Sequence, residues 1–404
     1  MGKHLDILLM ILFVTVINFL DISALSYTIV PIEEAFHLTD AHIGYISAGF
    51  GVGYLLTITF SGFLVDRFGS IKVWAISALL WSLITMATSL ARDFSSFLIL
   101  RILLGAVESA HFPSLVRTIA DWLEPASRGR SFAIALLGIP ISFIIGGPFL
   151  TSLIRIYTWK GMYVILGIFG LIWSVSWIFI FWDKKNPHLS ASPFPPTMNR
   201  PTLLRIFSQS PTFLSLCALN FTFAYLLFFA INWFPYYLQK IYSVEPGDAG
   251  FLGIIPWLSA ALFLIAGGIA SDFLLKKTRS LRIARSYQSI LGFFLAAICF
   301  LLLGFSQELG FSIFLFSLAL GAIFLFQTPL FVINIDLFPR HCSFAIGVTI
   351  LFASLALILS PAITGKLVSI TGDFQWAIHV SAAVSFAAGC IAYFFLKPEG
   401  RLEV

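Results

Sequence analysis

The chain is built from long apolar runs separated by short polar breaks. A helix that crosses the hydrocarbon core of a bilayer needs about 20 apolar residues, and runs of this length follow one another along the whole chain. They cover residues 5–30, 42–65, 71–90, 94–120, 131–154, 160–182, 212–239, 248–275, 284–304, 308–337, 342–369 and 375–396. The pattern predicts an all-α membrane protein with twelve transmembrane helices.

Composition agrees with this pattern and narrows the possible functions. Hydrophobic residues make up 59% of the 404 residues and charged residues only 11%, and the mean hydropathy is +0.97. Such a composition excludes a water-soluble fold. The net charge of +5 is spread thinly, so nucleic acid is not an expected partner. The four cysteines form no CxxC pair, so neither a disulfide framework nor a metal site is predicted.

Positive charge alternates between successive loops. If both termini lie in the cytoplasm, about 18 Lys and Arg fall on the inner side and about five on the outer side, which is the asymmetry of the positive-inside rule. The first apolar run is longer than a signal-peptide core and contains Asn18 and Asp21. We therefore expect a retained first helix and cytoplasmic termini.

The longest polar stretch divides the chain into two halves. Residues 183–211 contain five prolines between Pro187 and Pro201, which discourage a long helix and favour a cytoplasmic linker. Residues 1–182 and 212–404 would then form two six-helix bundles.

The two halves carry related motifs. Gly62 and Asp66 close the second helix of the first half, and Gly268 and Asp272 close the second helix of the other half, with the same Gly-x-x-x-Asp spacing. Two pseudo-symmetric six-helix repeats with a site at the midplane are the architecture of a secondary transporter.

Ionisable residues inside the predicted helices mark a candidate site. A charge at the bilayer centre costs about 2.5 to 3.5 kcal/mol on insertion scales, yet the N-terminal half contains Asp21, Arg101, Glu108 and His111. The last three are spaced by seven and three residues, which predicts one face of helix four. Moving Arg101 toward or away from a desolvated acid changes whether that acid holds a proton, which is a physical basis for proton coupling.

Several segments resemble the major facilitator superfamily, and its anion:cation symporter branch in particular. The resemblance covers nearly the whole chain and rests most specifically on the loop between helices two and three. Its segments are 62–72, 18–21, 50–54, 101–108, 112–113, 233–238 and 336–340. It implies the major facilitator fold and a carrier of organic anions in the bacterial inner membrane that functions as a monomer.

The resemblance also assigns roles to positions of this chain. Asp21 and Glu108 match acids used in proton coupling, Arg101 matches an arginine that pairs with an acid or faces the substrate, and Tyr54 matches a hydroxyl near the substrate. The arginine that usually follows the helix-one acid is replaced by Ile22. His111 is added to the proton-coupling residues. The substrate-binding candidates are Arg101, Tyr54, Asn18, Tyr225, Asn220, Gln327 and Ser354.

A second set of residues is expected to control conformation. Asp66 and Arg67, with Arg128 and Arg130 on a neighbouring cytoplasmic loop, can form charge pairs that close the inner face. Gly62 and Gly69 permit close helix approach and a tight turn. Asp272 is the weaker counterpart in the second half.

Each assignment has a plainer alternative. Asp21 and Arg101 can form a purely structural pair, and His111 can be a core histidine. Asn and Gln in membrane helices commonly bond to a neighbouring helix. Arg117 is expected to snorkel to the lipid surface.

Taken together, the sequence predicts proton-coupled symport of a small organic anion by alternating access. The expected partners are this solute, protons and the lipid bilayer. No Gly-x-x-x-x-Gly-Lys-Ser/Thr phosphate loop is present, so no nucleotide cofactor is expected. A transporter of this kind is not expected to be an enzyme. A proton-driven exporter of a more hydrophobic compound is the first alternative, and a channel or membrane sensor is the alternative from another class.

Overall fold

A computed structural model describes residues 5–38, 40–182, 200–245, 248 and 251–398. These residues form helices joined by short turns, and no β-strand occurs among them. The chain divides into two compact units. The first unit comprises Met1–Trp122, Ile134–His188 and His341–Gly347, and the second comprises Leu123–Ala133, Leu189–Arg340 and Val348–Val404.

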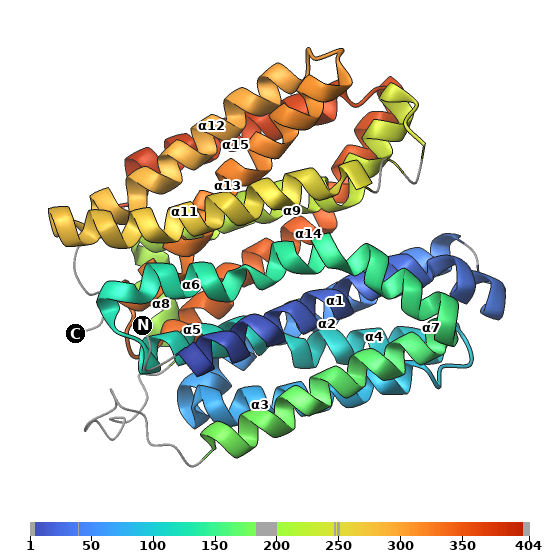
Figure 1. Cartoon of the computed structure of the whole chain (residues 1–404). Helices are drawn as coiled ribbons and strands as arrows, with labels where there is room; N and C mark the ends of the chain where they lie inside the picture. The colour runs from blue at the N-terminus through green and yellow to red at the C-terminus, as the bar shows by residue number, and fades with distance from the viewer. Residues whose placement is uncertain (1–4, 39, 183–199, 246–247, 249–250, 399–404) are drawn as a thin grey trace. The chain divides into compact units, whose positions relative to one another are not determined.

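The first unit contains the helices of the N-terminal half. Within it, α2 packs on α4, and α7 packs on both α1 and α3 (Figure 1). Its helices are α1 (Leu5–Phe36), α2 (Asp40–Phe68), α3 (Ser70–Thr88), α4 (Phe94–Glu108), α5 (His111–Trp122), the end of α6 (Arg128–Leu136), α7 (Gly138–Phe181) and the first residues of α14 (Cys342–Thr371).

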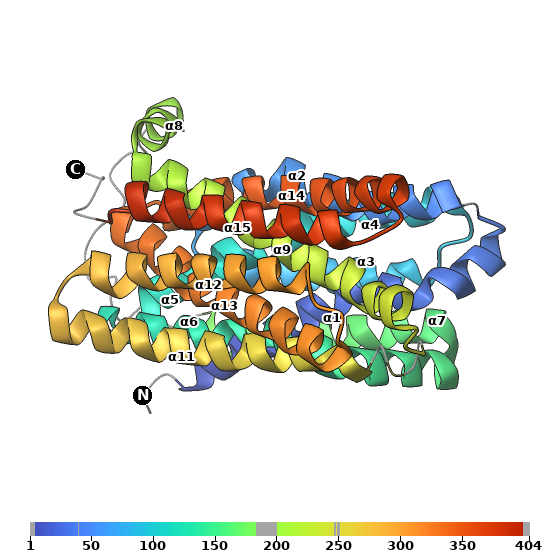
Figure 2. The ribbon, with the colours of Figure 1, turned by 90° about the horizontal axis from the view of Figure 1, so that it is seen from above.

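The second unit contains the helices of the C-terminal half. Here α13 packs on α11 and α12, and α12 also packs on α15, as Figure 2 shows from above. The elements are η2 (Pro125–Ser127) with the start of α6, α8 (Arg200–Gln209), α9 (Pro211–Tyr242), α11 (Ile254–Thr278), η3 (Arg282–Ser286), α12 (Tyr287–Leu303), α13 (Leu309–Leu337), the remainder of α14, and α15 (Gln375–Phe395).

The prediction of twelve membrane-spanning helices is confirmed. In the described part of the chain, 11 helical segments are long and apolar enough to cross a membrane. The longest of them, Pro125–Phe181, is broken at Thr158, whose φ of 64° and ψ of 172° lie outside the helical region. This segment therefore supplies two spans, as the polar break between residues 154 and 160 predicted.

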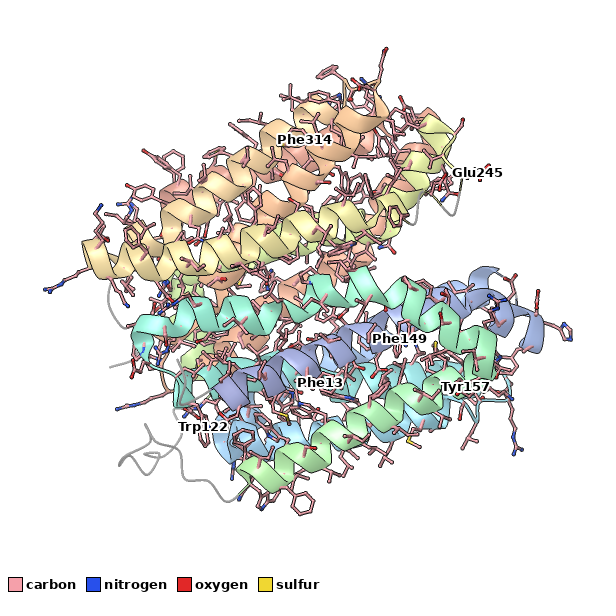
Figure 3. All side chains as sticks on the ribbon, in the orientation of Figure 1. Phe13, Trp122, Phe149, Tyr157, Glu245 and Phe314 are labelled. Carbon is pink, nitrogen blue, oxygen red and sulfur yellow. The ribbon has the colours of Figure 1, made fainter. Side chains whose placement is uncertain are left out.

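Large apolar side chains cover the outside of the helices. Phe13, Tyr157 and Phe314 are examples that project from the ribbon (Figure 3) and are about half exposed. A surface of this kind is unfavourable in water and suits contact with lipid.

The predicted linker is only partly covered by the structure. Residues 183–199 lie outside the described residues, and α8 begins at Arg200. The division into 1–182, 183–211 and 212–404 stays a prediction. Two short segments, 123–133 and 341–347, belong with the unit opposite to their own half of the sequence, and both contain residues of the candidate site.

Candidate functional site

Three ionisable side chains are buried together in the first unit. The exposed fractions of Asp21, Arg101 and Glu108 are 2%, 3% and 0%, and each of the three interacts electrostatically with the other two. Asn18 donates a hydrogen bond from Nδ2 to Oε2 of Glu108 at 2.7 Å. The structure therefore brings α1 and α4 together around these charges.

Arg101 occupies the centre of this group. Its guanidinium carbon lies 5.6 Å from the ring centroid of Phe50 on α2, a cation–π distance. Its Nε and Nη1 atoms, and Oε1 of Glu108, are buried without a hydrogen-bond partner among the described residues. A buried guanidinium with donors to spare is suited to bind a carboxylate.

Two residues that the sequence did not single out belong to the same group. Tyr163 on α7 interacts with both Asp21 and Arg101, and its hydroxyl lies 3.1 Å from that of Thr28. Thr85 on α3 faces the carboxylate of Asp21. Neither lies in a motif, so only the packing of α3 and α7 against α1 identifies them.

Tyr54 and His111 have different surroundings. Tyr54 interacts electrostatically with Glu108, and its ring lies 5.9 Å from that of Phe50, so it joins the charged group. His111 is fully buried, with its ring 5.4 Å from Trp74 and 6.3 Å from Trp81. α4 ends at Glu108 and α5 begins at His111, so the prediction that His111 continues the face of Arg101 and Glu108 crosses an interruption of the helix and stays a prediction.

The candidates of the second unit are all buried, and two of them bond to backbone. Asn220 donates to the carbonyl of Thr349 at 3.0 Å, and Ser354 donates to the carbonyl of Ile350 at 3.0 Å. Such bonds fit the plainer alternative of helix–helix and intrahelical contacts. Tyr225 and Gln327 are buried as well.

Asp66, at the end of α2, caps the first turn of α14. Its carboxylate accepts hydrogen bonds from the backbone amides of Ser343 at 3.3 Å and Phe344 at 2.8 Å. Arg117 lies 3.8 Å from the same carboxylate and also pairs with Asp121 at 3.0 Å. A carboxylate at a helix N-terminus satisfies free N–H groups and complements the helix dipole.

The glycines of the loop motif have the predicted properties. A Cβ atom at Gly62 would lie 2.3 Å from the carbonyl oxygen of Ser343, so only glycine allows this close approach. Gly69 has a φ of 86°, which is the left-handed region that glycine favours. Arg67 is exposed, and its guanidinium lies 5.5 Å from the ring of Phe68.

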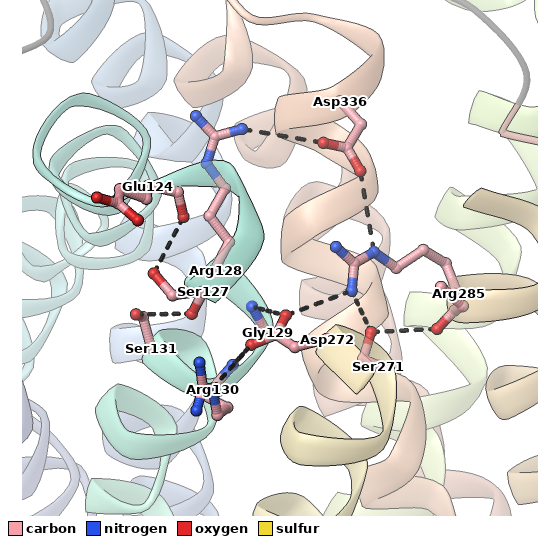
Figure 4. Close-up of polar contacts among 11 residues, drawn as sticks. Glu124, Ser127, Arg128, Gly129, Arg130, Ser131, Ser271, Asp272, Arg285 and Asp336 are labelled. Atoms are coloured by element: carbon pink, nitrogen blue, oxygen red, sulfur yellow. Dashed lines mark hydrogen bonds and ion pairs between the residues drawn. The ribbon is translucent and has the colours of Figure 1, made fainter. Parts of the chain in front are cut away.

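Asp272 in the second unit caps the start of α6 in the same way (Figure 4). It accepts hydrogen bonds at 2.9 Å from the backbone amides of Gly129 and Arg130, and Nε of Arg130 lies 3.3 Å away. Arg285 is 3.9 Å from Asp272.

Asp336 extends this network. It lies 3.9 Å from both Arg285 and Arg128, and Arg285 also donates to the hydroxyl of Ser271. Five charged residues of the second unit therefore join α11, η3 and α13 to the segment that starts α6 (Figure 4).

These contacts correct three expectations. Asp66 pairs with Arg117 rather than with Arg128 or Arg130, whose partners are Asp336 and Asp272. Arg117 does not snorkel, because it is 5% exposed and faces two carboxylates. Asp272 is not the weaker counterpart of Asp66, since it too accepts two backbone hydrogen bonds. In each case the partner comes from a part of the chain that the loop motif does not contain.

Comparison with known proteins agrees with this architecture. The family model described as Major Facilitator Superfamily matches residues 11–290 and 234–403. Among curated relatives, the "Hexuronate transporter" of Bacillus subtilis (strain 168) is 27% identical over 98% of this chain and 95% of its own length. The "Probable L-galactonate transporter" of Escherichia coli (strain K12) is 26% identical over 96% and 88%.

Two solved structures have the same fold. The human organic anion transporter MFSD10 (TETRAN) superposes with a TM-score of 0.76 at 13% identity and covers 97% of this chain and 100% of its own. A bacterial homolog of the human lysosomal transporter Spinster superposes with a TM-score of 0.65 at 17% identity over 98% of both chains. The family model and the twelve apolar helices together establish that this chain is a member of the major facilitator superfamily of membrane transporters.

Proposed function

We propose that the protein carries a small organic anion, a carboxylate of the sugar-acid type, together with protons by alternating access. The observation that carries this proposal is the buried group of Asp21, Arg101 and Glu108, in which two acids share one arginine. Such charges are costly inside a membrane protein, and the ones that occur mark pathways of substrates, ions or protons. They supply a site for a proton and a site for a carboxylate within one unit.

Arg101 is the proposed anchor of the substrate. Its unpaired Nε and Nη1 donors match the geometry of a carboxylate, and Asn18 and Tyr54 add polar groups at Glu108. Asn220, Tyr225, Gln327 and Ser354 are proposed contacts from the C-terminal half. The relatives named as transporters of hexuronate and L-galactonate support an anionic sugar derivative.

Proton coupling follows from competition for Arg101. When a substrate carboxylate binds the guanidinium, Asp21 and Glu108 lose part of their compensation and take up a proton. Moving one charge across 100 mV of membrane potential supplies about 2.3 kcal/mol, enough to drive uptake against a gradient. His111 is left out of this scheme, because aromatic rings surround it.

The two capping networks are the proposed conformational controls. Asp66 and Arg117, with the close approach at Gly62, would hold α2 to the start of α14, and Gly69 and Arg67 would shape the turn and the exposed charge beside it. Arg128, Arg130 and Asp272 would hold α11 to the start of α6. Such contacts bias the populations of inward- and outward-open states. We further propose a bacterial inner-membrane location, cytoplasmic termini and function as a monomer.

Export of a more hydrophobic compound driven by protons is the second candidate. The observation that favours it is Ile22, an apolar side chain directly after Asp21, at the position where the resemblance to the anion:cation symporter branch implies an arginine. With one cation fewer, the site binds an anion less strongly.

Reconstitution into liposomes tests the proposal. Internal pH is recorded while glucuronate, galacturonate, galactonate, galactarate or amphiphilic cations are presented under an imposed gradient. Saturable proton entry with one of the anions is the expected result. Silence with every anion, and proton movement with an amphiphilic cation, would replace symport by export.

The Asp21→Asn variant tests the role of the acid in the same liposomes. It should lose proton-driven accumulation and keep exchange of substrate across the membrane, because the neutral side chain cannot carry the proton. Accumulation at the wild-type level would remove Asp21 from the coupling group.

A further inference from the structure

The fourth membrane span is broken next to Glu108. α4 ends at Glu108, and α5 begins at His111. The sequence supplies the cause, because Pro113 has no amide hydrogen for the carbonyl of Ser109 and its ring clashes with that carbonyl in a straight helix. The break therefore lies one residue beyond an acid that we assign to proton coupling.

Backbone hydrogen bonds shift at this point. The amide of Ala110 donates to the carbonyl of Val107 at 3.4 Å, one residue closer than in an α-helix. The carbonyl of Ala106, which loses this donor, accepts instead from the hydroxyl of Ser109 at 2.8 Å. The hydroxyl of Thr57 also lies 3.0 Å from this carbonyl oxygen and 2.8 Å from that of Gly53. Side chains thus satisfy a carbonyl that the break frees.

Two further hydroxyls support the break. Ser77 on α3 donates to the carbonyl of Val107 at 2.5 Å, and the hydroxyl of Ser61 on α2 lies 2.6 Å from that of Ser109. Donors from two neighbouring helices therefore surround the break. These side chains can rotate, so their hydroxyls can follow the carbonyl oxygens of Ala106 and Val107 if the angle of the break changes.

The helix before the break is fixed. A Cβ atom at Gly53 would lie 1.9 Å from the carbonyl oxygen of Ile102, and one at Gly105 would lie 2.0 Å from that of Phe50. The backbones of α2 and α4 are thus in direct contact at two glycines, one on each helix. α4, with Arg101 and Glu108, cannot slide along α2 without a clash.

α5, the helix after the break, leads to the contacts around Asp66 that cap the start of α14. α5 carries Arg117, which lies 3.8 Å from Asp66, and Asp66 holds the amides of Ser343 and Phe344. His111, at the start of α5, contacts the rings of Trp74 and Trp81. Ring contacts of this kind are less directional than hydrogen bonds and allow small rotations.

We propose that the break at Ser109–Ala110 is a hinge through which the protonation of Glu108 sets the position of α5, and with it the strength of the contact between Arg117 and Asp66. Pro113, Thr57 and Ser77 are positioning residues of this hinge. The groups that face Glu108 are Asn18, Asp21, Tyr54 and Arg101. The inference rests on the proposed function, because it takes Glu108 as a proton-coupling acid.

Cys342 is a native reporter for this contact. It is fully buried and directly precedes Ser343, so it becomes open to alkylation when Asp66 releases α14. Cys217→Ser, Cys299→Ser and Cys390→Ser leave it as the one thiol of the full-length protein. The rate of maleimide alkylation in lipid nanodiscs is then measured by mass spectrometry, with no substrate required.

Glu108→Gln imitates the protonated acid in this assay. It should change the alkylation rate of Cys342 about fivefold or more, the scale of an allosteric coupling. Combined with Pro113→Ala, which restores a straight helix, it should leave the rate unchanged. Pro148→Ala, which removes a proline inside α7 of the same unit, is the matched control and should keep the full response.

The outcomes separate the hinge from the coupling role. If Glu108→Gln changes the alkylation rate of Cys342 equally in the presence of Pro113 and in the Pro113→Ala background, the hinge is overturned and the coupling role of Glu108 is not. If Glu108→Gln alone does not change the alkylation rate of Cys342, the hinge is overturned. Proton entry into liposomes tests symport independently of this result. If Pro113→Ala does not fold, the double variant Thr57→Val with Ser77→Ala should weaken the response, and a full response there would overturn the proposal.

Discussion

The two capping networks have the same centre and different surroundings. In each, the aspartate of a Gly-x-x-x-Asp motif accepts two backbone hydrogen bonds at the start of a helix, Asp66 on α14 and Asp272 on α6. The arginine beside Asp66 is Arg117 of α5, which also forms an ion pair with Asp121. Around Asp272 the buried arginine is Arg285 of η3, which Asp336 shares.

This difference shows which part of the motif is constrained. A helix N-terminus presents free N–H groups wherever it occurs, so a carboxylate at the right spacing can cap it in both halves. An arginine is needed only to compensate the buried charge, and it can come from any element within reach. The glycine and the aspartate of the Gly-x-x-x-Asp motif are therefore present in both halves, whereas the arginine beside the aspartate comes from a different element in each half.

Loss of the aspartate should have the largest effect, and it should be greater in the second unit. Asp272→Ala leaves Arg285, which is 1% exposed, with a single carboxylate at 3.9 Å, and breaking a buried pair costs about 3–5 kcal/mol. Asp66→Ala leaves Arg117 with Asp121 at 3.0 Å and should cost about 1–3 kcal/mol, the price of unsatisfied amides. Thermal unfolding in detergent measures both.

Asparagine variants serve as controls for this comparison. Asp66→Asn and Asp272→Asn retain an oxygen that accepts from the backbone amides, so each should be more stable than the corresponding alanine variant. Equal losses for Asp66→Ala and Asp272→Ala would show that the capping bonds dominate and that the arginines contribute little.

Filling the close contacts should have an intermediate effect and should show whether the two networks open together. At Gly62 an added methyl would meet the carbonyl oxygen of Ser343 at 2.3 Å, and at Gly268 it would meet the Cβ of Ala133 at 2.5 Å. Gly62→Ala should therefore displace the start of α14 and raise the alkylation rate of Cys342 about fivefold or more. Gly268→Ala should leave that rate near the wild-type value.

Gly44 provides the control, because nothing lies within 4 Å of a Cβ atom there. Gly44→Ala lies on α2 as Gly62 does, and it should not alter alkylation of Cys342. If Gly268→Ala exposes Cys342 as much as Gly62→Ala does, the two networks form one cooperative element rather than two separate ones.

The sequence predicted the helices and the shared motif because both depend on local patterns. Apolar runs locate the spans, and the spacing of Gly62 and Asp66 recurs at Gly268 and Asp272. The arginine partners could not be predicted in this way, since Arg117 and Arg285 reach their acids through the packing of separate helices. Thr85 and Tyr163 were missed for the same reason.

The prediction for His111 depended on a continuous helix. Helical periodicity places it on the face of Glu108 only if the helix is continuous, and the helix is interrupted at Ser109–Ala110, before His111. Pro113 was visible in the sequence. Its effect on the preceding turn, rather than on its own position, is what the structure adds.

The smallest effect is expected at Asp93, a carboxylate that caps a helix at the solvent-exposed surface. Comparing Asp93 with Asp66 and Asp272 shows how burial changes the contribution of a carboxylate cap. Asp93 caps α4 by accepting from the amide of Ser96 at 2.8 Å, and this hydrogen bond lowers the pKa of Asp93 below its ordinary value of 3.8. A lowered pKa stabilises the folded state above the ordinary pKa, and the contribution is lost as pH falls through the folded-state value. Protection of the Ser96 amide from hydrogen exchange should therefore decrease below about pH 4 in the wild type relative to Asp93→Asn.

The cap of α9, in which Ser210 accepts from the amide of Phe213 at 3.2 Å, does not titrate and should show no such change. A pH response at Phe213 equal to that at Ser96 would mean that acid loosens both units as a whole, and the solvent-exposed cap would then have no separate effect to compare with the buried ones.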